Sequence, residues 1–217
     1  MREEPQKETE IGPIPESWEV VAFIDSVSIK NGQVDPRQNP FVDMMHVGSE
    51  NIESDTGRLV KLCTNGELKI SSGNYYFTPD DVLYSKIRPY LNKVALPDFE
   101  GTCSADMYPL RSESHFIRDF LFYYLLSDDF KKAAMSFQDR TGIPKINRAQ
   151  LGSINLACPA KEEQSGIAEV LFTCDSRRDL AQRKKSQLQD LFRTLLHELM
   201  TAKTSVRELD IQSLLPA

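Results

Sequence analysis

The C-terminal part of the chain carries its most regular hydrophobic pattern. Apolar or small residues recur at every seventh position, at Ile167, Cys174, Ala181, Leu188, Leu195 and Ala202. A second row widens this stripe at its two ends, at Leu171, Phe192 and Leu199, while charged residues interrupt its middle. The spacing predicts one helix over residues 161–203, about 40 residues and roughly 60 Å long at about 1.5 Å per residue.

A small domain cannot cover the apolar stripe of so long a helix, so we expect a partner helix. The pairing surface would consist of apolar positions along the helix, namely Ile167, Leu171, Cys174, Leu188, Leu191, Leu195 and Leu199. Antiparallel pairing would set the apolar end of one helix beside that of its partner. The alternative is that the stripe packs against the chain's own domain.

Before this helix, short apolar runs alternate with turn-forming residues. The runs predict strands at residues 75–77, 82–84, 93–96 and 154–158, and a strand or short helix within residues 14–29. Apolar spacing over residues 116–137 predicts one amphipathic helix. The predicted fold class is α/β, with a mixed-sheet domain over residues 11–160 and a long C-terminal coiled-coil helix. Residues 1–10 are charged and aperiodic, which predicts a disordered lead-in, and residues 204–217 form a tail.

The composition is typical of a cytoplasmic globular protein. Hydrophobic residues make up 40% of the 217 residues, an ordinary share for a domain with its own core. The chain shows neither a charged-then-apolar leader nor an apolar run of about 18 residues, so we expect neither secretion nor a membrane span. The four cysteines lack Cys-x-x-Cys spacing, which favours free thiols in a reducing cytosol.

The formal net charge of −6 argues against a nucleic-acid binder until its distribution is examined. Residues 58–93 hold six basic and three acidic side chains (net +3), and residues 131–150 hold five and one (net +4). Affinity for a phosphate backbone depends on the groups that touch it, so a local patch is sufficient. The two basic segments are therefore candidates for contact with double-stranded DNA.

The segment from Asp81 to Lys93 is the strongest functional candidate. Its cations alternate with aromatic and aliphatic residues, and the candidate contacts are Lys86, Arg88, Asn92 and Lys93. Lysine and arginine pair with phosphates, while arginine can also fork onto guanine and asparagine onto adenine. The alternative is an edge strand that lysine and arginine keep soluble.

Two loops have side chains suited to base edges. The first runs from Lys30 to Arg37, and its candidates are Lys30, Asn31, Gln33 and Arg37. The second, from Thr64 to Ser72, contains Lys69. Each has a structural alternative, a turn at Asn31-Gly32 and a hairpin at Asn65-Gly66.

A third loop follows the predicted amphipathic helix and has the highest positive charge density in the chain. Its candidates for phosphate or groove contact are Arg140, Thr141, Lys145, Asn147 and Arg148. A solvated loop is the alternative.

The chain lacks the motifs of common active sites. It has no Gly-x-x-x-x-Gly-Lys-Ser/Thr loop and no Gly-x-Ser-x-Gly or His-Glu-x-x-His motif, and its three histidines are scattered. We therefore expect no catalysis, cofactor or metal on this chain. An enzyme hypothesis would have to use the carboxylates of Asp80, Asp81 and Asp106, for instance in a small nuclease.

Three segments, in this order, resemble those of type I restriction-modification specificity subunits. They are Ile14-Pro15-Glu16-Ser17-Trp18-Glu19-Val20; Asp81 to Pro89 with Lys93 and Gly101-Thr102-Cys103-Ser104; and Pro159, Glu163-Gln164 and Ile167 with a helix closing near Lys203. The resemblance spans roughly residues 11–203. Family members repeat this unit, whereas this chain shows one copy, so it resembles a half-length form with one target recognition domain.

The resemblance implies a sequence-specific DNA-binding subunit that recognises one half of a bipartite target. It implies recruitment of methyltransferase subunits, with restriction or motor subunits as further partners. Two copies paired through the long helix would rebuild the two-domain subunit as a homodimer. The alternatives are a fragment completed by a second, different chain, or a purely structural coiled-coil adaptor.

Overall fold

The computed structural model describes residues 5–137 and 144–205. The chain divides into two compact units, Met1–Ala168 and Glu169–Ala217. The first two turns of the long helix therefore belong to the globular unit, eight residues beyond the boundary that the sequence pattern predicts. Within the described residues, no helix has the length and apolar character needed to span a bilayer.

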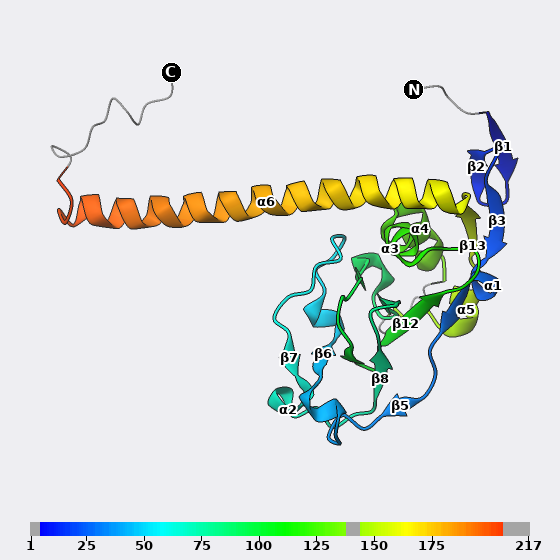
Figure 1. Cartoon of the computed structure of the whole chain (residues 1–217), viewed down its shortest axis with the longest axis horizontal. Helices are drawn as coiled ribbons and strands as arrows, with labels where there is room; N and C mark the ends of the chain where they lie inside the picture. Colours follow the sequence, from blue (N-terminus) through cyan, green and yellow to red (C-terminus); the bar gives the residue numbers. More distant parts are fainter. Residues whose placement is uncertain (1–4, 138–143, 206–217) are drawn as a thin grey trace. The chain divides into compact units, whose positions relative to one another are not determined.

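The globular unit contains a four-stranded sheet, of which Figure 1 labels strand β12. Its strand order is β10 (Val94–Ala95), β9 (Asp81–Ser85), β12 (Met107–Ser112) and β4 (Val27–Ile29). All pairings are antiparallel, and every residue of β9 is buried. The short run Val82–Tyr84 is thus confirmed as a strand. Val82 and Tyr84 on one face of β9 pack into one hydrophobic core, and Leu83 on the other face packs into a second core.

A five-stranded sheet contributes the second core. Its order is β5 (Gln33–Val34), β8 (Asn74–Phe77), β11 (Gly101–Cys103), β6 (Met45–Val47) and β7 (Cys63–Thr64). Only the β11–β6 pair is parallel, so the sheet is mixed, as predicted. Phe77 and Cys103 pack with Leu83 of β9, which joins the two sheets through one apolar cluster.

Two further strand pairs lie near the N-terminus. Strands β1 (Gln6–Thr9) and β2 (Gly12–Pro15) form an antiparallel hairpin, in which Gly12 adopts a φ of 101°. Strand β3 (Glu19–Ala22) pairs with β13 (Asn155–Cys158). The disorder predicted for the lead-in is wrong for Gln6–Thr9. The prediction rested on composition, which does not show that the backbone of these residues hydrogen-bonds to β2.

The helix predicted over residues 116–137 is two helices. Helix α3 (Arg118–Leu126) ends at Ser127, whose extended backbone (φ −65°, ψ 152°) begins α4 (Asp128–Met135). The Ser127 hydroxyl accepts a hydrogen bond from the Phe130 amide and caps α4. The apolar spacing continues across the break because both helices face one core with Tyr84 and Leu110.

Short helices complete the globular unit. They are α1 (Phe23–Ser26), α2 (Asn65–Leu68) and α5 (Arg148–Gly152), with 3-10 turns η1 (Phe41–Asp43), η2 (Ser49–Asn51) and η3 (Pro89–Leu91). The hairpin considered at Asn65-Gly66 is wrong. The Thr64 hydroxyl and the Glu67 carboxylate instead form a reciprocal capping box for α2.

The long helix α6 (Lys161–Met200) is fixed to the globular unit by its first two turns. The buried amide of Gln164 donates to the carbonyl oxygens of His115 and Pro159 and accepts from the Ile117 amide, each at 2.8 Å. Ala168 is also buried, and Ile167 packs against the core. Ile167 is half-buried and packs on the chain's own domain, which is the alternative that the stripe left open, and its pairing role stays a prediction.

Removing the Gln164 side chain should destabilise the globular unit. Gln164→Ala leaves an amide and two carbonyl oxygens without their buried partner, so we expect the free energy of unfolding to fall by about 3 kcal/mol. Urea unfolding followed by fluorescence of Trp18, whose indole donates to Glu163 in the same helical turn, measures this loss. Gln182→Ala, an exposed position of α6, should stay within about 0.5 kcal/mol. Equal midpoints for both variants would remove the anchoring role.

Candidate nucleic-acid interface

The fold brings the two basic segments of the sequence side by side. The Arg88 amide donates to the Pro144 carbonyl at 2.8 Å, and the Ile146 amide donates to the Lys86 carbonyl at 2.9 Å. Ile87 and Lys145 form an antiparallel bridge between them. Cations more than fifty residues apart in the chain therefore lie on neighbouring extended segments.

Arg88 and Lys145 are the exposed cations of this junction. Among the residues that the structure describes, neither side chain has a hydrogen-bond or ion-pair partner. Arg88 adopts the left-handed conformation (φ 48°, ψ 61°), which is uncommon for a residue with a Cβ atom. The next turn, η3, exposes Tyr90 at 42%. This arrangement presents positive charge and an aromatic ring to the solvent.

The remaining candidates of the Asp81–Lys93 segment serve the fold. Asn92 is 2% exposed and donates to the Leu126 carbonyl at 2.8 Å, so its assignment as a base-reading residue is wrong. Lys86 donates to the Ala105 carbonyl and Lys93 to the Ser49 carbonyl, each at 2.6 Å. These bonds hold both ammonium groups against the backbone, because each lysine satisfies a carbonyl that a loop leaves unpaired.

The third predicted loop likewise contains residues that hydrogen-bond within the fold and one exposed cation. Asn147 caps helix α5 by accepting from the Gln150 amide at 2.9 Å, and its side chain is otherwise exposed. Arg148 donates to the carbonyl oxygens of Ile29 and Lys30, at 2.9 and 2.7 Å. Arg140 and Thr141 lie outside the described residues. Only Lys145 of this group is exposed without a partner in the described part of the chain.

The loop that follows Lys30 presents polar side chains to the solvent. Asn31 and Gln33 are exposed, and β5 holds Gln33 opposite Tyr75 of β8. Arg37 forks onto Asp35, with Nε and Nη2 at 2.9 and 2.8 Å from its two carboxylate oxygens. Hydrogen bonds from Arg37 lower the pKa of Asp35 to about 2. The pair is local and exposed, so Arg37 can exchange this carboxylate for another acceptor.

The two predicted base-reading loops meet at one groove. Arg37 and Lys69 both line a cavity of about 270 Å³, whose other walls are Pro36, Val42, Asn65, Gly66, Ile70 and Ser71. The Gln33 side chain also lies against Gly73, so a Cβ atom at Gly73 would collide with it. The fold thus places candidates from both loops around one recess.

Beneath this groove lies a buried polar cluster that the sequence did not reveal. The Asn65 amide donates to the Phe41 carbonyl and the Thr102 hydroxyl, both at 2.7 Å, and the Asn74 amide donates to the Asn65 oxygen at 3.1 Å. His46 lies 3.0 Å from the same Asn74 amide. Burial lowers the pKa of His46, which favours its neutral form. The residues of this cluster lie far apart in the sequence, so no local pattern predicts that they meet.

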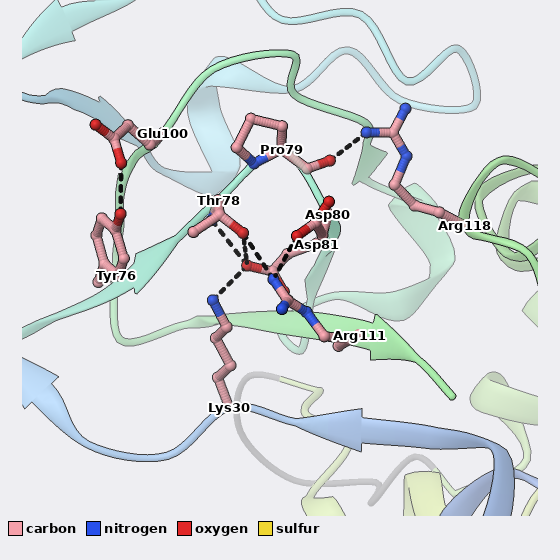
Figure 2. A network of polar contacts seen from close by, with 9 residues as sticks. All are labelled: Lys30, Tyr76, Thr78, Pro79, Asp80, Asp81, Glu100, Arg111 and Arg118. Atoms are coloured by element: carbon pink, nitrogen blue, oxygen red, sulfur yellow. Dashed lines mark hydrogen bonds and ion pairs between the residues drawn. The ribbon is translucent and has the colours of Figure 1, made fainter. Parts of the chain in front are cut away.

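The carboxylate of Asp81 is the centre of a second polar network (Figure 2). It is fully buried and accepts from Lys30 Nζ at 2.5 Å, Arg111 Nε at 2.9 Å and the Thr78 amide at 2.8 Å. Neighbouring Asp80 is exposed and lies 3.5 Å from Arg111. Figure 2 shows Lys30 and Arg111 reaching the Asp81 carboxylate, so Lys30 is not a free DNA contact.

The carboxylates that an enzyme hypothesis would use form ion pairs in this fold. Asp81 is already neutralised by two cations, and Asp106 lies 3.7 Å from Lys86. Over residues 5–137 and 144–205, no three His, Cys, Asp or Glu side chains are grouped as metal ligands. The carboxylates that the hypothesis requires are therefore used in ion pairs of the fold.

Comparison with known proteins gives a consistent result. The family described as the type I restriction modification DNA specificity domain matches residues 15–190. The specificity subunit of the type I restriction enzyme EcoDI from Escherichia coli is 36% identical over 168 residues, which cover 75% of this chain and 36% of that protein. The MjaVIII specificity subunit from Methanocaldococcus jannaschii is 27% identical over 226 residues, which cover 94% of this chain and 50% of that protein.

Solved structures show the same fold. The HsdS subunit from Thermoanaerobacter tengcongensis superposes with a TM-score of 0.64 at 22% identity, over 84% of this chain and 48% of that one. The S subunit of a type I restriction-modification system from M. genitalium gives 0.60 at 16% identity, over 85% and 46%. The chain spans about half, or less, of the length of these relatives.

Neutralising Asp81 should destabilise the fold because it leaves two cations facing an uncharged amide. We expect Asp81→Asn to lower the free energy of unfolding by roughly 3 kcal/mol. Asp80→Asn makes the same chemical change one residue away, at a carboxylate that is 78% exposed, and should change it by less than about 0.5 kcal/mol. Urea unfolding of both variants checks this, and a loss at Asp80 as large as at Asp81 would contradict the central role of the buried carboxylate.

Proposed function

The chain belongs to the family of type I restriction modification DNA specificity domains, and from this membership we propose that it binds one half of a bipartite DNA target and recruits methyltransferase subunits. The observation that supports this most directly is the meeting of the two basic segments at Arg88 and Lys145. The chain itself contributes recognition, and its partners supply the chemistry of methylation and, where present, of cleavage.

Two kinds of DNA contact are distributed over different parts of the globular unit. Arg88 and Lys145 contact phosphates, because they are exposed cations on fixed backbone. Arg37 and Lys69 line one recess, Asn31 and Gln33 are exposed on the segment that leads to Arg37, and these four side chains read base edges with their amide, guanidinium and ammonium donors. The net charge of −6 limits binding to arbitrary DNA, so affinity depends on this local surface.

The long helix pairs with a second copy of the chain in this proposal. Large apolar side chains are exposed along it, namely Val170, Leu171, Phe172, Leu180, Leu188, Leu191, Phe192, Leu195, Leu196 and Met200. Cys174 is exposed and Leu199 is half-buried. An antiparallel pair with two-fold symmetry makes each contact twice and covers these side chains. Two identical recognition domains would then read an interrupted palindrome, with half-sites separated by very roughly one DNA turn, about 34 Å.

Removing one phosphate contact should weaken binding to all sequences equally. We expect Arg88→Ala and Lys145→Ala each to reduce the slope of log affinity against log salt by about one unit, because one counterion fewer is released. Arg37→Ala should instead change which bases are preferred. The measurement is a salt titration with a duplex selected from a randomised pool, using the chain together with a methyltransferase subunit of its system.

Lys132→Ala is the matched control, because this lysine is exposed on α4 and pairs with the exposed Asp129. Its salt slope should equal that of the parent. Unchanged slopes for both Arg88→Ala and Lys145→Ala would show that the junction of the basic segments does not face DNA.

Charges placed in the apolar row of the helix should separate the copies. Leu188→Glu combined with Leu195→Glu puts two carboxylates into each half of the pairing surface, so we expect monomers by light scattering where the parent is a dimer. Gln182→Glu, a charge at an exposed polar position of the same helix, is the control and should leave the dimer intact. A parent chain that is monomeric alone and dimerises only with a different chain would contradict self-pairing. It would show that a second, different chain completes the subunit.

A further inference from the structure

Arg148 is half-buried, and its guanidinium group binds two backbone carbonyl groups and lies near two aromatic rings. Its Nη1 and Nη2 atoms donate to the carbonyl oxygens of Ile29 and Lys30, at 2.9 and 2.7 Å. Its Cζ atom lies 5.1 Å from the ring centre of Tyr108 and 5.9 Å from that of Tyr75. A fork of two donors that also stacks on aromatic rings is a geometry that arginine can make and lysine cannot.

The two carbonyl groups that Arg148 binds mark the end of strand β4. Ile29 is the last residue of β4, and Lys30 is the first residue of the segment that continues to Arg37. Lys30 is also held at its amide, which donates to the Pro109 carbonyl at 3.0 Å, and at its ammonium group, which binds Asp81. Three parts of one residue are thus fixed by three different elements.

The segment that starts at this fixed point carries three of the proposed base-reading side chains. Asn31 and Gln33 lie one and three residues after Lys30, and Gln33 pairs with Tyr75, one of the two rings near the Arg148 guanidinium. A shift of the Lys30 carbonyl would therefore move the starting point of the reading segment. Because a hydrogen bond to a base edge tolerates only small displacements, such a shift changes which base is preferred.

We propose that Arg148 is a positioning residue that sets the sequence preference of the half-site by fixing the start of the Asn31–Arg37 segment, without touching DNA. This inference rests on the proposed DNA-recognition function. It replaces the phosphate contact that the basic loop sequence predicts for Arg148. Its neighbour Lys145, three residues earlier in the chain, remains exposed and keeps that role.

Two substitutions separate positioning from phosphate contact. Arg148→Lys keeps the positive charge but loses the fork onto two carbonyl groups, whereas Arg148→Gln also removes the charge. Positioning predicts the same result for both variants: discrimination between the selected half-site and its single-base variants falls about tenfold, and the salt slope stays at the parent value. A phosphate contact predicts near-parent behaviour for Arg148→Lys and a slope lowered by about one unit for Arg148→Gln.

Lys145→Ala is the reference variant, with a lowered slope and unchanged base preference. Thermal unfolding of each variant shows that the globular unit is intact under the binding conditions. Base preference that is unchanged in both Arg148 variants overturns the positioning role, as does a slope lowered only in Arg148→Gln. The parent chain is measured first. If it shows no salt-dependent, sequence-selective binding, the proposed function itself is contradicted, whatever the Arg148 variants do.

Discussion

The buried carboxylate of Asp81 is the interaction on which the globular unit depends. It stands at the first position of the wholly buried strand β9, directly opposite Arg111 of β12. It also holds Lys30, the first residue after β4. A carboxylate without its cations would be costly to bury, so the positions of Arg111 and Lys30 follow from that of Asp81. The β9–β12 pairing and the start of the segment from Asn31 to Arg37 are thereby coupled through one group.

The cations of this chain fall into two groups, which their hydrogen bonds distinguish. Lys86, Lys93 and Arg148 donate to backbone carbonyls that loops leave without partners, and so hold those loops in place. Arg88 and Lys145 have no such partner among the described residues and face the solvent. Only groups of the second kind release counterions when a phosphate approaches. A local positive surface therefore exists on a chain whose net charge is negative.

The long helix shows a similar division along its length. Its first two turns belong to the globular unit, where Gln164 satisfies the amide at the start of α3 and two carbonyl oxygens. Beyond Ala168 most of its large apolar side chains are exposed, and more of them lie towards the C-terminal end. Exposed apolar rows of this length are uncommon on monomeric proteins, because contact between apolar side chains and water is unfavourable. Packing against another protein surface would remove that contact. The helix is therefore anchored at one end and carries an exposed apolar row along the rest of its length.

Several features of the protein follow from the sequence by itself. The seven-residue repeat predicts the long helix, short apolar runs predict strands such as Val82–Tyr84, and charge clustering identifies both basic segments, because each signal is local. Three ordered segments also indicate the family. The tertiary structure alone decides which cations remain exposed. The residues next to a lysine do not show whether its ammonium group will bind a distant carbonyl or face the solvent. It likewise decides that Asn92 is buried, that Ser127 divides one apolar pattern into two helices, and that Ile167 packs on its own domain. Each of these outcomes depends on partners remote in the chain, and no spacing of residues encodes which partner a side chain will meet.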